Sequence, residues 1–429
     1  MLDMLKAAGA NIVEFDEKAD IYIVNTCSVT NIADKKSRQM LHRARKMNPD
    51  GIVIAAGCYV QSAREILEQD EAIDIVISNN KKKSITEIVN DYINVRNNEK
   101  NAPGKDHEAM EYFVDISRET EYEEMGGHVP VGHTRAYVKI QDGCNQFCSY
   151  CIIPYVRGRI RSRSQEAILA EVSELAEAGI KEVVLTGIHI SSYGKDKNNE
   201  GALIELIEAI SKIKGIKRIR LGSLEPGIIT EEFVERISSN SKVCPHFHLS
   251  LQSGCDSVLK RMNRKYTCEQ YFEKCDMLRK AYKSPALTTD VIVGFPGETE
   301  EEFAETVRYL TELNLYEMHI FKYSPRKGTV AAAMKEQVAP EIKNERSDVL
   351  LKLAHDNKTA YEAQFEGCEL EVLVEEVVKK DNKTYLRGHT ERYMDILIDV
   401  GDISMPESFV NSFVYVTYTQ NGGNLPLLL

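Results

Sequence analysis

Three cysteines in one short segment are the most chemically distinctive feature of this 429-residue sequence. Cys144, Cys148 and Cys151 form a CxxxCxxC pattern, and with 10 cysteines in 429 residues chance would supply about 0.005 such matches. Three soft thiolates in one loop suit zinc or an iron–sulfur cluster. A structural zinc would need a fourth cysteine or histidine nearby, and the next histidine is His189. The pattern therefore favours a four-iron cluster with three protein ligands and one iron open to a substrate.

Two further cysteines follow predicted buried strands near the N-terminus. Cys27 ends the string Asn25-Thr26-Cys27, and Cys58 ends the string Ala56-Gly57-Cys58. The carboxyl end of a parallel sheet is where doubly wound folds bind ligands, so both thiols are candidate ligands. The remaining cysteines are predicted to be small buried hydrophobic residues: Cys244, Cys255, Cys268, Cys275 and Cys368.

Alternating strands and helices are predicted to position these cysteines. Residues 1–95 alternate helical and extended patterns, which predicts βαβ units and a doubly wound parallel sheet. Residues 131–360 alternate again, which favours a partial (β/α)6 TIM-type barrel. The three-cysteine segment follows the first of these six strands, at the barrel mouth where active sites form. The six strands are expected at residues 136–140, 182–186, 218–222, 246–251, 288–293 and 319–323.

Two other regions differ in character from these α/β segments. Residues 96–130 combine Asn, Gly and Pro with many acids, which predicts an exposed acidic linker. Residues 367–429 lose the helical period and carry short strand patterns with turns between them, which predicts a small C-terminal β-barrel. The fold class is therefore α/β, with a small β-barrel at the end of the chain.

The charge of the chain is unevenly distributed. The net charge is −12, which argues weakly against a nucleic-acid partner, yet residues 35–46 carry six basic side chains and no acid. Residues 367–429 hold ten acids against five bases. No apolar run approaches the roughly 18 residues of a membrane span, and the first residues do not resemble a signal peptide. A cytoplasmic location and no membrane partner are expected.

The three-cysteine loop on the first strand of a six-strand partial barrel resembles the radical S-adenosylmethionine (SAM) superfamily. The resemblance implies a [4Fe-4S] cluster on Cys144, Cys148 and Cys151, whose open iron chelates SAM. It also implies that the reduced cluster cleaves SAM to methionine and a 5′-deoxyadenosyl radical that abstracts a hydrogen atom. Tyr150 corresponds to the aromatic residue that lies near the adenine.

Longer strings are similar to one subfamily, the methylthiotransferases. These are Leu185-Thr186-Gly187, Gly222-Ser223-Leu224-Glu225-Pro226, Leu249 to Gly254, Asp290 to Thr299 and Phe321 to Arg326, in the correct order along the barrel. The resemblance places Thr186 and Gly187 at the SAM amine, and Ser223 and Glu225 within reach of the ribose. It adds further SAM-binding candidates at Gln252, Val293, Gly294 and Tyr323.

In the methylthiotransferases, N-terminal cysteines hold a second, auxiliary [4Fe-4S] cluster that supplies or carries sulfur. The family triad is represented here by Cys27 and Cys58, and the chain begins within the helix that should follow the first triad cysteine. The sequence thus predicts a truncated N-terminus that lacks its first strand, and an auxiliary cluster that is labile or absent. The C-terminal barrel resembles the RNA-binding TRAM domain.

The strings 25–39, 140–143 and 158–163 look most like the branch that acts on N6-threonylcarbamoyladenosine at tRNA position 37. The implied mechanism uses one SAM to methylate a sulfur of the auxiliary cluster and a second SAM to remove the adenine C2 hydrogen. The implied partners are tRNA and an electron donor such as flavodoxin or ferredoxin, and the protein is expected to be a monomer. Candidate RNA-binding residues are Lys35, Lys36, Arg38, Arg43, Arg157 and Arg159.

Several alternatives remain open at this point. The substrate could instead be isopentenyladenosine in tRNA or an aspartate of a ribosomal protein, and the chain could be an inactive RNA-binding remnant. The basic helix could be no more than a solvated face. The arginines that follow the three-cysteine loop could form ion pairs with the acidic linker.

Overall fold

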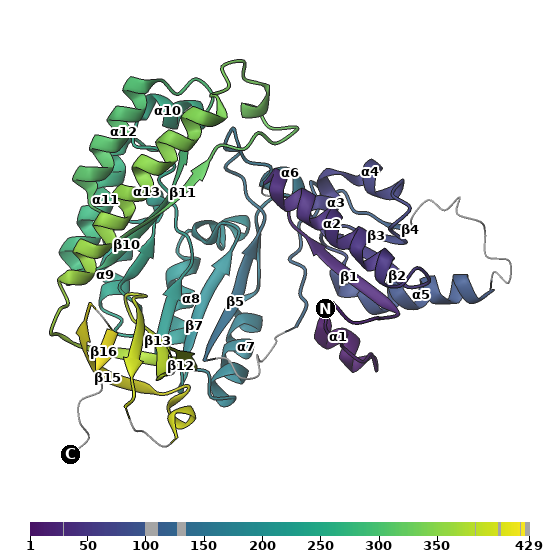
Figure 1. Ribbon diagram of the computed structural model, residues 1–429, viewed down its shortest axis with the longest axis horizontal. Helices are drawn as coiled ribbons and strands as arrows, with labels where there is room; N and C mark the ends of the chain where they lie inside the picture. Colours follow the sequence, from purple (N-terminus) through teal and green to yellow (C-terminus); the bar gives the residue numbers. More distant parts are fainter. Residues whose placement is uncertain are drawn as a thin grey trace. The chain divides into compact units, whose positions relative to one another are not determined.

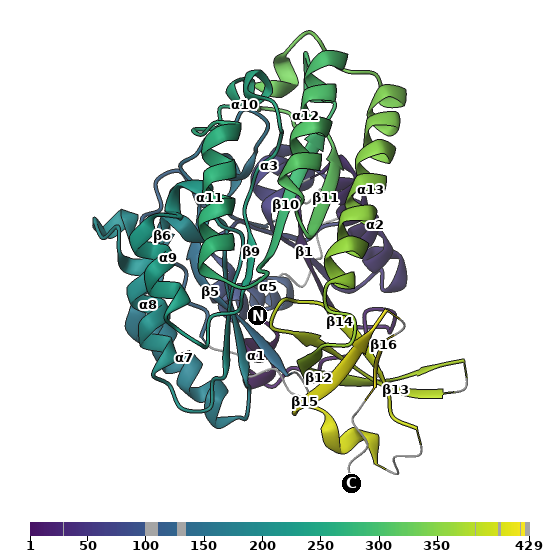
Figure 2. The same ribbon diagram turned by 90° about the vertical axis from the view of Figure 1, so that its left-hand side faces the viewer.

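The computed structural model describes residues 1–28, 30–98, 110–126, 134–381, 383–401, 405–420 and 422–424 (Figures 1 and 2). The chain forms two compact units. Unit 1 comprises residues 1–128, 142–162 and 324–333, and unit 2 comprises residues 129–141, 163–323 and 334–429. Among the described helices, none is both long enough and apolar enough to cross a membrane.

Unit 1 contains a parallel sheet with the strand order β1-β2-β3-β4. Every residue of β2 (Ile52–Gly57) is buried, as expected for a central strand covered on both faces. β1 (Ile21–Thr26) pairs with β2 and, within the described residues, forms an edge of the sheet. The predicted doubly wound parallel sheet is confirmed.

The acidic linker prediction for residues 96–130 needs correction. The helix α5 (Ile85–Asn98) extends into this region, and β4 (Met110–Tyr112) pairs with β3 (Ile75–Ile77) as a fourth strand. The physical reason is that β3 would otherwise expose unpaired backbone groups along its free edge. Residues 99–109 and 127–133 lie outside the described residues.

Short helices connect these strands. α2 begins after Thr30, whose side chain accepts a hydrogen bond from the Ala33 amide at 3.1 Å and so caps the helix. The other helical and extended segments of unit 1 are α1 (Leu2–Ala7), α2 (Asn31–Met47), α3 (Cys58–Ser62), α4 (Arg64–Glu68), α6 (Ile153–Val156) and β6 (Arg161–Ser162).

Unit 2 is built on six parallel strands. Two sets of three, β5-β7-β8 and β9-β10-β11, are joined by parallel bridges from Ile219 to Val243 and from Leu224 to Leu249. This arrangement confirms the predicted partial barrel. The strands are β5 (Arg135–Asp142), β7 (Glu182–Gly187), β8 (Arg218–Leu221), β9 (His246–His248), β10 (Ala286–Val293) and β11 (Glu317–Lys322).

Helices cover the outer face of this barrel, and α11, α12 and α13 run alongside β10 and β11 (Figure 1). Capping boxes start two of them, Thr267 with Gln270 at α11 and Thr299 with Glu302 at α12. The helices are α7 (Gln165–Glu177), α8 (Ala202–Ser211), α9 (Glu231–Ser238), α10 (Asp256–Arg261), α11 (Cys268–Ala281), α12 (Glu300–Leu313) and α13 (Pro340–Ala363).

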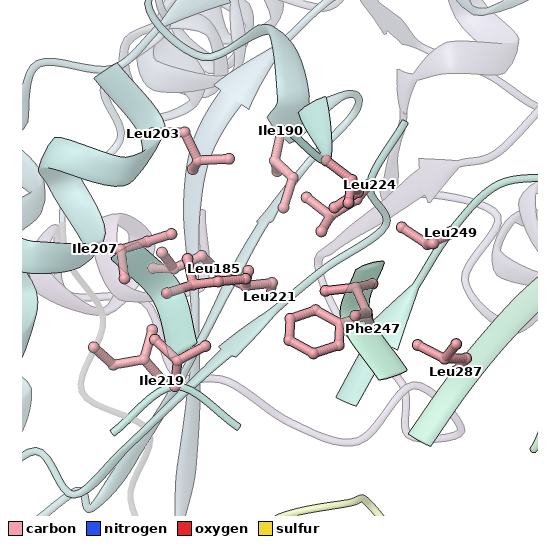
Figure 3. Packing of buried hydrophobic residues seen from close by; sticks show 14 of the residues in the cluster. Leu185, Ile190, Leu203, Ile207, Ile219, Leu221, Leu224, Phe247, Leu249 and Leu287 are labelled. Carbon is pink, nitrogen blue, oxygen red and sulfur yellow. The ribbon is translucent and has the colours of Figure 1, made fainter. Parts of the chain in front are cut away.

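The apolar core of unit 2 lies between the strands and these helices. Figure 3 shows Leu185 and Leu221 from the strands meeting Leu203 and Ile207 of α8. Alternate strand residues supply this core, so the intervening residues point to the opposite face, into the barrel. Polar side chains on that inner face are therefore available for binding.

The C-terminal part of unit 2 is a closed barrel with the order β12-β13-β14-β16-β15, which confirms the predicted small β-barrel. Two of its acids bind arginines of the larger barrel: Glu371 contacts Arg218 at 2.9 Å and Glu375 contacts Arg135 at 3.1 Å. The strands are β12 (Glu369–Lys380), β13 (Lys383–Thr390), β14 (Asp395–Asp399), β15 (Phe413–Thr419) and β16 (Gly422–Asn424).

Candidate active site

The three-cysteine loop follows β5 and belongs to unit 1. Cys144 is buried, and Cys148 and Cys151 are half-buried. The Gln146 amide donates to the Cys144 sulfur at 3.4 Å, and the Cys151 amide donates to the Cys148 carbonyl at 3.0 Å. Amide donors to cysteine sulfur are one of the contacts that tune iron–sulfur clusters, so this donor set fits such a cluster.

Close backbone packing fixes both ends of this loop. Gly143 has φ +74°, and a Cβ there would lie 1.7 Å from the Arg159 carbonyl oxygen. The Cys144 amide donates to the Gly158 carbonyl at 3.0 Å. The guanidinium of Arg159 lies 4.5 Å from the centre of the Phe147 ring, a cation–π distance. The loop is therefore held by contacts with residues 158 and 159, which follow it in the chain.

Cys27 and Cys58 follow paired positions of neighbouring strands, because Thr26 of β1 pairs with Gly57 of β2. Gly57 has φ +104°, and a Cβ there would lie 2.5 Å from the Thr26 carbonyl oxygen. A glycine before Cys58 is thus required by the close approach of the two strand ends. Cys27 is exposed and Cys58 is buried.

The Cys58 sulfur is surrounded by residues from outside its own strand. The Arg157 Nε donates to it at 3.1 Å, and the Asn79 Nδ2 lies 3.7 Å away. Asn79 also donates to the Val156 carbonyl at 2.7 Å, and Cys58 packs with Ile152 and Val156. The segment that leaves the three-cysteine loop is therefore part of the environment of Cys58, and both belong to unit 1.

Arg157 is a half-buried cation shared between two partners, Cys58 and Asp142, the latter at 3.2 Å. Burial by itself lowers the pKa of this guanidinium, but Asp142 and Cys58 outweigh that effect and raise the pKa above its ordinary value. Arg157 therefore stays charged beside the sulfur. This partner was missed in the sequence, and RNA binding by Arg157 stays a prediction.

The segment 324–333 completes unit 1. Arg326 is buried and forms a 2.6 Å ion pair with Asp34 of α2, and the Ala331 amide donates to the Ser149 carbonyl within the three-cysteine loop. Burial raises the pKa of Asp34, while Arg326 acts to lower it. One short segment thus contacts both α2 and the loop.

The predicted SAM-binding residues of unit 2 gather at one end of the barrel. Each is one of the last two residues of a strand or lies within four residues after it, at the carboxyl end where barrel sites form. They are Thr186 and Gly187 at the end of β7, Ser223 and Glu225 after β8, Gln252 after β9, Val293 at the end of β10, Gly294 after it, and Tyr323 after β11.

Two of these positions are conformationally constrained. Gln252 has φ +76°, and its backbone bridges β10 through bonds to the Asp290 carbonyl and the Ile292 amide, both 2.9 Å. Such a conformation in a non-glycine residue persists only where the surroundings impose it, often at functional sites. Gly294 has φ +69°, and a Cβ there would lie 2.3 Å from Cγ of Lys343.

Tyr323 and Glu225 present polar groups in this region. The Tyr323 hydroxyl is buried without a hydrogen-bond partner in the described part of the chain, and burial raises its pKa to about 12. An orphaned buried hydroxyl indicates a missing polar ligand. Both carboxylate oxygens of Glu225 accept from Arg264 at 2.8 Å. These features fit a polar cofactor such as SAM.

The arginines that stabilise this end of the barrel were not predicted from the sequence. Arg346 of α13 forms a 2.7 Å ion pair with Glu298, which in turn accepts from the Gly294 amide at 2.6 Å. Burial raises the pKa of Glu298, against the opposing influence of Arg346. Glu298 and Glu225 lie within strings noted in the sequence, but no local signal identified their respective partners, Arg346 and Arg264.

The predicted RNA-binding residues of α2 divide into two groups. Lys35, Lys36 and Arg38 are exposed, whereas Arg43 forms a 2.7 Å ion pair with Asp16. A groove of about 1080 Å³ runs beside the helix. It is lined by basic residues and also by acids, among them Arg38, His42, Lys46, Asp70 and Asp74.

Two families of known proteins match this chain. Residues 138–310 match the radical SAM superfamily, and residues 1–78 match the uncharacterized protein family UPF0004. Among solved structures, a radical SAM methyltransferase, TsrM, from Kitasatospora setae aligns with a TM-score of 0.53 and 16% identity. The alignment covers 72% of this chain and 63% of that one, and it supports the fold.

Several curated proteins are similar over most of their length. The threonylcarbamoyladenosine tRNA methylthiotransferase MtaB of Bacillus subtilis is 39% identical, over 92% of this chain and 85% of that protein. Its namesake in Aquifex aeolicus is 37% identical, over 90% of this chain and 92% of that protein. A tRNA-2-methylthio-N(6)-dimethylallyladenosine synthase of Thermoanaerobacter pseudethanolicus is 36% identical, over 97% and 86%. The chain belongs to the methylthiotransferase family of the radical SAM superfamily.

Proposed function

We propose that this protein is a tRNA methylthiotransferase that converts N6-threonylcarbamoyladenosine at tRNA position 37 to its 2-methylthio derivative. The observation that carries the proposal is the 39% identity to an MtaB enzyme over 92% of the chain, which includes the three-cysteine loop. The relatives named MtaB are 35–39% identical and those named for dimethylallyladenosine 36–37%, so the preference rests on the 39% match. The threonylcarbamoyl branch is therefore the first choice and the dimethylallyl branch the second.

Cys144, Cys148 and Cys151 would hold the [4Fe-4S] cluster that membership of the radical SAM superfamily implies. With SAM bound, this cluster supplies a 5′-deoxyadenosyl radical that abstracts hydrogen from the substrate. The chain holds the three thiols in a loop closed by Gly143, and the Gln146 amide offsets negative charge on the Cys144 sulfur. Thr186, Gly187, Ser223, Glu225, Gln252, Val293, Gly294 and Tyr323 are proposed to bind SAM, with Tyr150 near its adenine.

Cys27 and Cys58 are proposed to bind an auxiliary cluster that provides the sulfur of the methylthio group. The support is their position at adjoining strand ends and the charged Arg157 at the Cys58 sulfur. A fixed cation beside the sulfur offsets the negative charge that a cluster ligand carries.

The tRNA is proposed to contact the exposed basic side chains of α2, Lys35, Lys36 and Arg38, with Arg159 as a further candidate. These side chains suit phosphate contacts, which orient the RNA without reading its sequence. We further propose that the enzyme acts as a cytoplasmic monomer and takes electrons from a flavodoxin or ferredoxin.

Mass spectrometry of tRNA nucleosides tests this function. A strain without the gene should lack 2-methylthio-N6-threonylcarbamoyladenosine and regain it when the gene is restored, while a Cys148→Ala gene should fail to restore it. Loss of the dimethylallyl derivative instead would assign the other tRNA branch. Unchanged tRNA together with loss of a ribosomal-protein modification would reject a tRNA substrate.

A further inference from the structure

Three polar side chains on three neighbouring strands face the inside of the partial barrel. His248 ends β9, Asp290 lies in β10 and His319 lies in β11. His248 pairs with Thr288, and Asp290 pairs with His319, so the register places all of them on one face of the sheet. The opposite face carries Phe247, Leu249, Leu287, Val291 and Met318, which belong to the apolar core. Figure 3 shows the first three of them in this core.

The cluster shares no side chain with the proposed SAM site but lies beside it, since the Gln252 amide donates to the Asp290 carbonyl at 2.9 Å. Asp290 precedes Val293 by three residues, which is about 10 Å along an extended strand. None of its members is a cysteine, so it offers two imidazoles and one carboxylate in place of thiolates. Nitrogen and oxygen ligands select a different set of metals from the soft sulfur of the cluster loop.

One distance between donor atoms matches that of a metal site, and the other donor atoms lie near enough for a small adjustment to complete one. Nε2 of His248 lies 3.4 Å from Oδ2 of Asp290, and the ligand atoms of the three residues all lie within 4.8 Å of one another. Ligands at 2.0–2.1 Å from a tetrahedral zinc ion are about 3.3 Å apart. A separation of 3.4 Å is long for a direct N–H···O hydrogen bond. His319 is exposed, so a small side-chain rotation is free to bring it closer.

The ring of His248 is also held in an orientation suited to metal binding. Its Nδ1 lies 3.0 Å from the Thr288 hydroxyl, while its Nε2 is buried and has no hydrogen-bond partner in the described ranges. A histidine that binds metal through one nitrogen commonly bonds a neighbouring oxygen through the other. If Nδ1 donates to Thr288, Nε2 faces a carboxylate oxygen, and a proton or a metal cation between the two is favourable.

We propose that His248, Asp290 and His319 form a site for a divalent transition metal, of which zinc is the probe to use. Two histidines and one carboxylate on a metal leave coordination positions open, as in catalytic zinc and non-haem iron sites. These positions face the barrel interior, where they accept water or an anionic oxygen ligand.

Zinc content of the holoenzyme tests the proposal. Protein with reconstituted clusters is dialysed against micromolar Zn²⁺, freed of excess metal and analysed for zinc and iron. The wild type should retain about one zinc per chain more than Asp290→Asn and His319→Ala. His355→Ala, an exposed histidine on α13, is the matched control and should retain the wild-type amount. Equal zinc in all four proteins would overturn the proposal.

Two further measurements make the result specific. Iron content and SAM binding of both variants should equal those of the wild type, which shows that the barrel has folded. X-ray absorption at the zinc edge should show only nitrogen and oxygen neighbours at about 2.0–2.1 Å. Sulfur neighbours at about 2.3 Å would place the zinc on cysteines and reject the histidine–aspartate site.

Discussion

The three-cysteine loop and the Cys27–Cys58 site hold their thiols in different ways. Cys144, Cys148 and Cys151 lie within eight residues of one another, and the loop is closed by contacts within its own segment. Cys27 and Cys58 are 31 positions apart and follow the paired ends of two strands, whose register is fixed.

The environment of Cys58 also depends on the three-cysteine loop. The Cys58 sulfur receives its charged partner, Arg157, from the exit of the three-cysteine loop. Within the loop, the Gln146 amide donates to the Cys144 sulfur, and the Cys151 amide donates to the Cys148 carbonyl. Damage to the loop should therefore affect both sites, whereas damage at Cys58 should stay local.

The strongest test of this asymmetry is Cys148→Ala. Loss of a cluster ligand should reduce 5′-deoxyadenosine formation by more than about 100-fold, because even residues that only support a metal ligand contribute 10–100-fold. The methylthiolated product should disappear with it. Production of 5′-deoxyadenosine is measured by liquid chromatography, with the exposed Cys368→Ala as control. Substantial activity in Cys148→Ala would contradict the assignment.

The next test is Cys58→Ser, which should separate the two products. Methylthiolated tRNA should fall by more than about tenfold, while 5′-deoxyadenosine forms at close to the wild-type rate, because the three-cysteine loop is intact. Both products are quantified in one reaction. Equal loss of both products would show that damage at Cys58 also impairs the three-cysteine loop.

Arg157 gives a finer test of the link between the sites. Arg157→Met removes the charge at the Cys58 sulfur and should lower iron bound at this site and methylthiolation by about tenfold. Arg157→Lys keeps the charge but cannot bind both Cys58 and Asp142. Its bound iron and its methylthiolation should therefore lie between those of the wild type and Arg157→Met. Arg118→Met, which removes an exposed ion pair with Asp115, is the control. If Arg157→Met kept the wild-type iron content, this arginine would not contribute to iron binding at Cys58.

The smallest effect is expected on α2, which carries charge but no cysteine. Replacing Lys35, Lys36 and Arg38 with alanine should weaken tRNA binding several-fold, and the slope of log affinity against log salt should decrease by about 2–3. Iron content should not change. Filter binding at several salt concentrations measures this, and an unchanged salt slope would mean that this helix face does not contact RNA.

The difference between ligands that are close in sequence and ligands that are far apart also explains how well each site was predicted. The loop was recognised because its three cysteines are close in sequence, and six strands were found because each has a clear apolar pattern. β4 was missed because three residues in an acidic stretch give no such pattern, and only the free edge of β3 requires a strand there. Arg157 was missed as the partner of Cys58 because 99 positions separate them.

The ion pairs of the acidic C-terminal barrel were likewise not predictable from the sequence. Its ten acids against five bases argued against a strong contribution to RNA binding. In the structure, Glu371 and Glu375 bind Arg218 and Arg135 of the larger barrel, so part of this charge is neutralised within unit 2. Net charge along the sequence could not reveal such pairs, because 153 and 240 positions separate their members.

The central claim is that this enzyme removes the C2 hydrogen of N6-threonylcarbamoyladenosine in tRNA. Reconstituted enzyme, reductant and SAM would be supplied with tRNA that carries deuterium at this C2 position. The account predicts 5′-deoxyadenosine with one deuterium, formed in step with 2-methylthio-N6-threonylcarbamoyladenosine. Unlabelled 5′-deoxyadenosine alone, or label transfer only from tRNA with a dimethylallyl group, would contradict it.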